Sequence, residues 1–129
     1  MSEGVKTIKV IDSHTAGEPT RVVVDGAPKN PGATPAEWRE FLRNEHDWLR
    51  TAMVCEPRGH EAVVGALLCK PTQPDCVAGV VFFNNVGYLH GCLHGTIGVT
   101  VTLEHLGQLK TGENKIETPT GTVTVCPPE

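Results

Sequence analysis

The sequence predicts an α+β domain in which a sheet of short strands curls around one buried helix. About six or seven short segments are continuously apolar or alternate between apolar and polar residues, as strands do. Two longer segments carry helical signals, and the one from about Gly95 to Gly107 contains a single charged residue, Glu104. A helix this apolar is expected to be buried on nearly all sides. A sheet that surrounds such a helix is an α+β arrangement.

The first two strands are expected to form a hairpin. Val5–Ile11 alternates between apolar and polar residues, and Thr20–Val24 is rich in valine and ends at the turn signal Asp25-Gly26. The intervening Asp12–Pro19 is polar, contains glycine and proline, and is predicted to be a loop. Such a loop either forms a hydrogen-bonded turn or lines a functional site, and both interpretations stay open.

A helix is predicted from Thr34 to about Ala52, after the Pro/Gly-containing linker Lys29–Thr34. Thr34 and Glu37 form a capping box, with proline at the first helical position. His46 is expected to be solvated. Apolar side chains recur along one stripe, which predicts a structural helix packed on the outside of the sheet. The stripe consists of Trp38, Phe41, Leu42, Trp48 and Leu49.

The second half of the chain supplies the remaining strands. Cys55–His60 is predicted to be a turn, and Glu61–Cys69 is apolar sequence typical of a strand. Pro71–Asp75 is a predicted loop, and Cys76–Phe83 is a predicted buried strand. Beyond the apolar helix, Lys115–Val125 is expected to form two short strands around a Pro-Thr-Gly turn.

Cys92 lies in the turn before the apolar helix. The free N–H groups and the positive end of the helix dipole favour a thiolate there, and the same N–H groups can hold a carboxylate or phosphate. Two other interpretations stay open. Cys92 is a small buried hydrophobe, or it shares a zinc site with His90 and His94, for which a further ligand set is missing. The other cysteines are expected to be structural: Cys55, Cys69, Cys76 and Cys126.

Composition limits the classes of function. The 129 residues correspond to one domain, and the net charge of −4 argues against a nucleic-acid partner. The sequence predicts no membrane span, and its N-terminus lacks the apolar region of a signal peptide. The five cysteines include no C-x-x-C pair, so neither a zinc ribbon nor a disulfide framework is expected. This cysteine usage fits a reducing, cytoplasmic location.

The run GYLHGCLHGTIGV around Cys92 resembles the first catalytic motif of the proline racemase family, usually a Met-Cys-Gly-His-Gly run followed by Thr-Ile-Gly. Two further segments, Ile11–Val23 and Cys55–Leu68, agree with the same family. Within it, the wording FFNNVGY is most similar to that of the 4-hydroxyproline epimerases. Gly91 and Leu93 depart from the pattern, because the family usually has Met and Gly at these positions.

The resemblance implies a fold and a domain organisation. The fold is the half-barrel of proline racemase and diaminopimelate epimerase, a curled, mostly antiparallel sheet around a central helix. Two such domains face each other, and the active site lies between the N-termini of the two central helices. Residues 1–129 correspond to the N-terminal domain of this two-domain enzyme. The family's second motif, a Cys-Gly-Thr-Gly-Thr-like run, does not occur in this sequence, and neither does the aspartate that holds the substrate amine.

The resemblance also implies the chemistry and the site. The reaction is a two-base inversion of Cα in 4-hydroxyproline or proline, without pyridoxal or any other cofactor and without a metal. Cys92 is one base, and the backbone amides of Leu93, His94 and Gly95 bind the substrate carboxylate. Only the amide of residue 93 is used, so leucine there is compatible with binding. By the same resemblance, the His94 side chain contacts the ring nitrogen.

Three further positions follow from the same resemblance. Val64 lines the substrate ring, where a small residue leaves more room than phenylalanine, and His14 and Thr15 line the site. The identity of the second base separates the subfamilies: cysteine implies a racemase or epimerase, and threonine or serine implies a trans-3-hydroxyproline dehydratase. A third possibility is a non-catalytic half-domain that binds a small carboxylate. A homodimer that brings two Cys92 thiols together is a further expectation.

Overall fold

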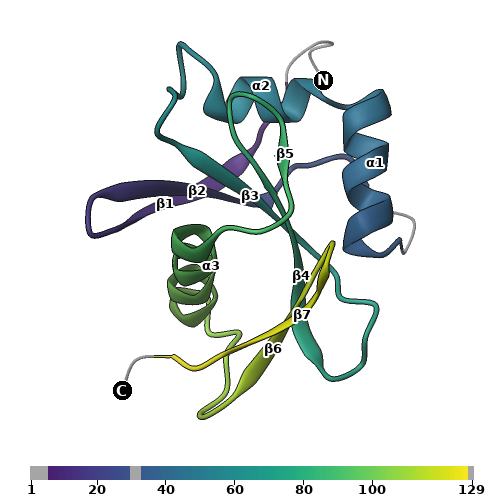
Figure 1. Ribbon diagram of the computed structural model, residues 1–129, viewed down its shortest axis with the longest axis vertical. Helices are drawn as coiled ribbons and strands as arrows, with labels where there is room; N and C mark the ends of the chain where they lie inside the picture. Colours follow the sequence, from purple (N-terminus) through teal and green to yellow (C-terminus); the bar gives the residue numbers. More distant parts are fainter. Residues whose placement is uncertain (1–5, 30–32, 128–129) are drawn as a thin grey trace.

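One mixed sheet of seven strands organises the chain (Figure 1). The computed structural model describes residues 6–29 and 33–127. Its strands pair in the order β1-β2-β3-β4-β6-β7, and the short β5 pairs with β4. The strands are β1 (Lys9–Thr15), β2 (Glu18–Asp25), β3 (Val64–Cys69), β4 (Cys76–Phe83), β5 (Tyr88–Leu89), β6 (Asn114–Thr118) and β7 (Gly121–Val125). The helices are α1 (Pro35–Glu45), α2 (Trp48–Val54) and α3 (Leu93–His105).

The strand pairings are mostly antiparallel. The pairs β1–β2, β3–β4, β4–β5 and β6–β7 are antiparallel, whereas β2–β3 and β4–β6 are parallel. The combination of a mixed, mainly antiparallel sheet with helices agrees with the predicted α+β class. The half-barrel curl is not confirmed by this sheet and remains a prediction.

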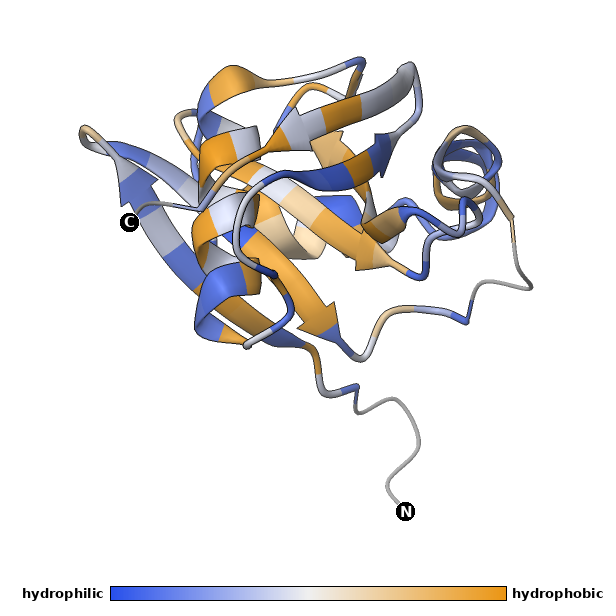
Figure 2. Ribbon diagram, turned by 90° about the horizontal axis from the view of Figure 1, so that it is seen from below, coloured by the Kyte–Doolittle hydropathy of each residue, from blue (hydrophilic) through white to orange (hydrophobic). Residues whose placement is uncertain are grey.

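Helices cover both faces of the sheet. The helices α1 and α2 pack on one face in a core that contains Val23, Leu67 and Phe83, and α3 packs on the other face. Because neighbouring side chains on a strand point to opposite faces, Val23 and Phe83 are buried under α1 and α2, whereas the preceding Val22 and Phe82 are buried under α3. Burial on both sides explains why the central strands are almost entirely apolar, as Figure 2 shows.

The predicted hairpin forms, but the prediction of a long polar loop between its strands is wrong. The first strand continues through the polar residues to Thr15, and only Ala16 and Gly17 make the turn. Both turn residues have positive φ, 51° and 91°, which suits the right-handed twist of a two-residue hairpin. Asp12 does not bond the backbone but pairs across the ladder with Arg21, at 2.9 Å. The predicted start of this strand at Val5 lies outside the described residues.

The long helix predicted from Thr34 to Ala52 is instead two helices, α1 and α2. The chain leaves helical geometry at His46, where φ is −139° and ψ is 35°. His46 is not simply solvated: its Nδ1 accepts a hydrogen bond from Trp48 Nε1 at 3.3 Å, and its ring meets the Phe41 ring edge-on. The apolar stripe survives the break because both helices turn their apolar faces to the sheet.

The predicted capping box is confirmed at the start of α1. The Thr34 hydroxyl accepts from the Glu37 amide at 3.2 Å, and the Glu37 carboxylate accepts from the Thr34 amide at 3.0 Å. The hydrogen bonds that the Thr34 amide and hydroxyl donate to the Glu37 carboxylate lower the pKa of Glu37. Thr34→Ala is expected to lower the free energy of unfolding by about 1 kcal/mol, measured by urea denaturation, because it removes the N-cap oxygen. Thr34→Ser keeps that oxygen and should stay near the parent; equal losses in both variants would contradict the assignment.

The apolar helix α3 begins two residues before the predicted start, with Cys92 as its N-cap. It ends as predicted at Gly107, which has φ of 72°, with the amide of Gln108 bonded to the carbonyl of Leu103 at 2.9 Å. The expectation of burial on nearly all sides is wrong for the described residues. Leu93, Ile97 and Val101 recur every four residues on one face, and they are 81%, 41% and 44% exposed.

No helix in residues 6–29 and 33–127 has the length and apolar character that crossing a bilayer requires.

Candidate active site

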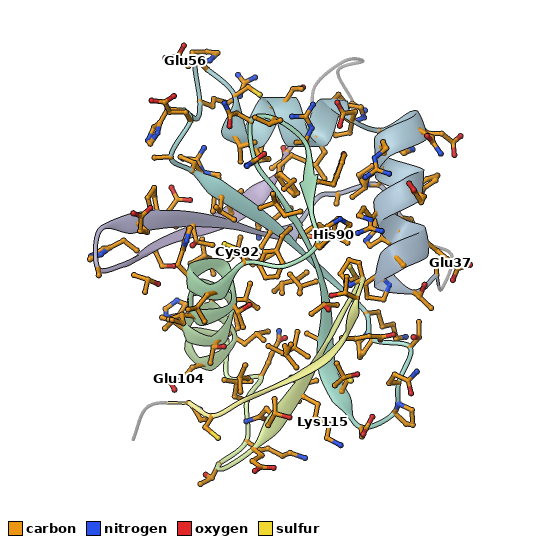
Figure 3. The ribbon with its side chains drawn as sticks, viewed as in Figure 1. Glu37, Glu56, His90, Cys92, Glu104 and Lys115 are labelled. Carbon is orange, nitrogen blue, oxygen red and sulfur yellow. The ribbon has the colours of Figure 1, made fainter. Side chains whose placement is uncertain are left out.

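Cys92 lies at the open N-terminal end of α3 (Figure 3). Its backbone is extended, with φ of −158° and ψ of 120°, and its carbonyl accepts hydrogen bonds from both the amide and the hydroxyl of Thr96, at 2.9 Å and 2.7 Å. These bonds start the helix and fix the position of residue 92. The thiol is partly exposed, and its Sγ lies 3.6 Å from Nδ1 of His94. A thiol and an imidazole at this separation can share a proton.

The first turn of α3 supplies backbone donors beside this thiol. The amides of Leu93, His94 and Gly95 precede the first intrahelical donor, Thr96, so they belong to the free N–H groups at a helix start. Gly95 is packed tightly, because a Cβ there would lie 2.9 Å from the Phe82 ring and 3.2 Å from Cβ of Cys92. Because its amides are free, the first turn of α3 can hold a carboxylate next to Cys92.

Thr15 and His14 leave opposite faces of β1. The Thr15 hydroxyl donates to the carbonyl of His94 at 3.4 Å, so this side chain lies on the α3 side of the sheet. Alternation along the strand directs the His14 side chain to the other face, where it is exposed and its Nδ1 accepts from the amide of Gly17 at 3.1 Å. The structure brings Thr15, but not His14, to the first turn of α3. The substrate contacts expected of both remain predictions.

Val64 is the first residue of β3 and is 8% exposed. It belongs to the apolar core under α3, together with Val99 and Leu103. Its surroundings are those of a packing residue, and its role in lining a substrate ring remains a prediction.

The segment that leads to Cys92 is fixed by three residues that the sequence did not single out. Arg50 donates to the carbonyls of Asn84 and Asn85 at 3.1 Å and 3.0 Å, and it is paired with Asp47 at 2.8 Å. Tyr88 donates its hydroxyl to the same Asp47 carboxylate at 2.8 Å. The hydrogen bonds from Arg50 lower the pKa of Asp47. The pKa of Tyr88 is raised, mainly by burial and secondly by its hydrogen bond to Asp47. No sequence motif joins α2 to this segment, so only the fold reveals the contact.

His90 does not gather with Cys92 and His94 into a ligand set. Its Nδ1 lies 3.5 Å from Nη1 of Arg39, and its carbonyl accepts from the Thr120 hydroxyl at 3.3 Å. A neighbouring guanidinium disfavours a bound cation. In the part of the chain that the structure describes, no three His, Cys, Asp or Glu side chains are arranged to hold a metal ion.

The other cysteines differ from Cys92 in their surroundings. Burial raises the pKa of the Cys69 thiol, and the nearby Glu117 carboxylate raises it further. Burial also raises the pKa of Cys76. Cys55 donates its thiol to the Asn85 carbonyl at 3.8 Å, and Cys126 is exposed near the end of the described chain. Of the five cysteines, Cys92 alone is the N-cap of a helix.

Comparison with known proteins identifies the family of the chain. The proline racemase family matches residues 10–127. A protein of Burkholderia cenocepacia described as 4-hydroxyproline epimerase is 58% identical over 119 residues, which are 92% of this chain and 38% of that protein. The chain thus spans about two fifths of the length of this relative.

Two solved structures resemble the chain. One is a hydroxyproline epimerase from Agrobacterium vitis with bound trans-4-hydroxy-L-proline, with a TM-score of 0.82 and 26% identity over 91% of this chain and 36% of that one. The other is a probable proline racemase from Agrobacterium radiobacter with bound carbonate, with a TM-score of 0.83 and 31% identity over 92% and 36%. Because the family match covers nearly all of the sequence, the chain belongs to the proline racemase family.

Proposed function

We propose that this chain forms part of a pyridoxal-independent epimerase that inverts Cα of 4-hydroxyproline, with Cys92 as one of two bases. The observation that carries the proposal is the position of Cys92, at the N-cap of α3 and 3.6 Å from His94. The substrate class is supported by a relative described as 4-hydroxyproline epimerase and by a solved neighbour with bound trans-4-hydroxy-L-proline. Proline is the alternative substrate.

The proposed chemistry needs one base on each face of the stereocentre. The Cys92 thiolate removes the Cα proton from one face, and a protonated base on the other face returns a proton. Negative charge then develops on the substrate carboxylate. The amides of Leu93, His94 and Gly95 are suitable donors for it, since preorganised backbone donors stabilise such charge without reorganisation. His94 is proposed to contact the substrate's ring nitrogen through Nδ1, the ring nitrogen that faces Cys92, and Thr15 to hold the first turn.

We assign the second base to a second domain, which the longer relatives have room for. In this proposal residues 1–129 are the N-terminal domain, and the sheet completes a half-barrel around α3 in the whole protein. The exposed apolar residues Leu93, Ile97 and Val101 support it, because such a stripe needs cover. The dehydratase alternative depends on the identity of the second base, which this proposal places outside residues 1–129. A cytoplasmic location is proposed because all five cysteines are free.

The same stripe favours one second candidate, a homodimer of this chain. Two copies that cover each other's Leu93, Ile97 and Val101 would bury apolar surface that each exposes alone. Because Leu93 follows Cys92 directly, such a dimer would bring the two thiols to one interface. It would act as a two-base site or as a non-catalytic carboxylate-binding module.

Iodoacetamide near neutral pH is expected to alkylate Cys92 fastest of the five cysteines, by about tenfold or more over the next. The physical reason is that the thiolate is the nucleophile, and a free cysteine is only a few per cent thiolate at pH 7. The free amides at the start of α3 can donate hydrogen bonds to sulfur at residue 92, and His94 lies beside it. Peptide mapping of samples quenched at successive times gives the five rates.

Cys126 provides the internal control, because it is exposed and does not lie at the end of a helix. Its rate sets the value expected from exposure alone. Cys69 and Cys76 should react slowly, because burial raises the pKa of each. Reaction of Cys126 or Cys55 ahead of an inert Cys92 would remove the physical basis of the proposal.

A further inference from the structure

Three buried polar atoms on the β1–β2 hairpin and α3 have no hydrogen-bond partner among the described residues. They are Oγ of Ser13, Oγ1 of Thr20 and Nε2 of His94. Thr20 is buried most deeply, with 1% of its surface exposed. Buried polar atoms in folded proteins nearly always have a partner, either in the protein or in an ordered water molecule. Three unpaired atoms in this part of the fold therefore need an explanation.

Ser13, Thr20 and His94 lie where the β1–β2 hairpin packs against the first half of α3. Ser13 and Thr20 lie directly opposite each other in the ladder, so their side chains share one face. Thr20 lies against α3, because a Cβ added to Gly98 would be 2.9 Å from its Oγ1. His94 is one turn before Gly98 on the same face of the helix. Thr15, on the same face of β1 as Ser13, donates to the carbonyl of His94.

The hairpin crosses α3 at the end of the helix that carries Cys92 (Figure 1). A single small group that both donates and accepts hydrogen bonds would satisfy all three atoms. Each hydroxyl can donate or accept, and a ring nitrogen does one or the other according to the tautomer. Water fits these requirements, since buried waters typically make about three hydrogen bonds to otherwise unpaired groups.

We propose that Ser13, Thr20 and His94 hold one internal water molecule between the hairpin and α3, and that this water positions the His94 ring for Cys92. The other ring nitrogen, Nδ1, lies 3.6 Å from Cys92 Sγ. For Nδ1 to accept the thiol proton from Sγ, the neutral ring must carry its own proton on Nε2, so Nε2 donates a hydrogen bond both before and after the transfer. The water oxygen accepts that hydrogen bond, and the two hydroxyls orient the water. Ser13 and Thr20 are thus positioning residues.

The water site itself follows from the unpaired atoms alone. Its role toward Cys92 rests on the proposed function. The two parts therefore need separate measurements, one at His94 and one at the thiol.

Thr20→Val removes the hydroxyl and keeps the shape of the side chain, whereas Thr20→Ser keeps the hydroxyl. In the parent chain and in Thr20→Ser, NMR should detect a nuclear Overhauser effect between the His94 ring and a long-lived water. In Thr20→Val this signal should disappear, the ring ¹⁵N resonances of His94 should shift, and the melting temperature should fall. The iodoacetamide rate of Cys92 should fall with it, and Thr20→Ser should restore it.

A dry site gives the opposite results. If the hydroxyl is truly unpaired, its replacement by a methyl group raises the melting temperature and leaves the His94 resonances unchanged, which would overturn the water site. Ser13→Ala provides a second variant if Thr20→Val does not fold, with the same expected changes in signal. Altered His94 resonances with an unchanged Cys92 rate would overturn the positioning role only. An inert Cys92 in the parent chain would overturn the proposed function and leave the water site standing.

Discussion

Trans-4-hydroxy-L-proline incubated with this chain in deuterium oxide is expected to exchange its Cα hydrogen slowly without inversion. Cys92→Ser is expected to slow that exchange by about 10²–10⁴-fold, the usual contribution of a general base. One base can remove a proton and return a deuteron only to the same face, and in the proposed mechanism the chain supplies one such base, Cys92. Proton NMR measures the loss of the Cα signal, and chiral chromatography measures the configuration.

Cys55→Ser is the matched control, because Cys55 is also free and partly exposed but is not the N-cap of a helix. It should leave the exchange rate unchanged. Inversion at a rate that rises with the square of the protein concentration would support a homodimeric site with two Cys92 thiols. Exchange that survives Cys92→Ser undiminished would contradict the assignment of Cys92 as a base.

Elements with a strong local signal were predictable from the sequence. The capping box at Thr34 and the stop at Gly107 depend only on residues within one turn, so their chemistry decides the structure locally. The strand Cys76–Phe83 was equally predictable, because eight consecutive residues are apolar or small. These elements set the start of α1, a central strand of the sheet and the end of the helix that carries Cys92.

The errors arose where tertiary contacts overrule local preference. Asp12–Thr15 was predicted to be a loop because its residues are polar, but pairing along β2 keeps it extended. The break at His46 was hidden because the apolar stripe continues through it. It depends on contacts of His46 with Phe41 and Trp48, which differ from the ordinary helical pairs.

The candidate site was predictable only in part. The sequence drew attention to Cys92 and His94, since a thiol before a helix has a known chemistry. It gave no sign that Thr15 and His14 would leave opposite faces, because that follows from their place in an extended strand and the sequence predicted a loop there. The pairing of Ser13 with Thr20 over Gly98 likewise depends on how the hairpin lies on α3.

Leu103→Ala and Val101→Ala are expected to have very different effects, although both remove apolar groups from α3. Leu103 is completely buried against the sheet, so its truncation should lower the free energy of unfolding by about 2–5 kcal/mol. Domains of this kind are stable by only about 5–15 kcal/mol, so this is a large fraction of the total. Val101 is 44% exposed, and its truncation should change stability by no more than about 0.5 kcal/mol. Urea denaturation at low protein concentration measures both.

Comparing Leu103→Ala with Val101→Ala also tests whether a second domain or a second copy covers the exposed face of α3. Alanine has a higher helix propensity than valine. If Val101 is exposed to solvent, Val101→Ala should therefore leave the free energy of unfolding unchanged or raise it slightly. If two copies cover that face, the cost of Val101→Ala should instead grow with protein concentration, since the dimer contributes more stability as it fills. A cost equal to that of Leu103→Ala even in dilute solution would mean that Val101 is buried within the single chain. The stripe would then be part of the core, as the apolar sequence of the helix first predicts, and neither a second domain nor a second copy would be needed to cover it.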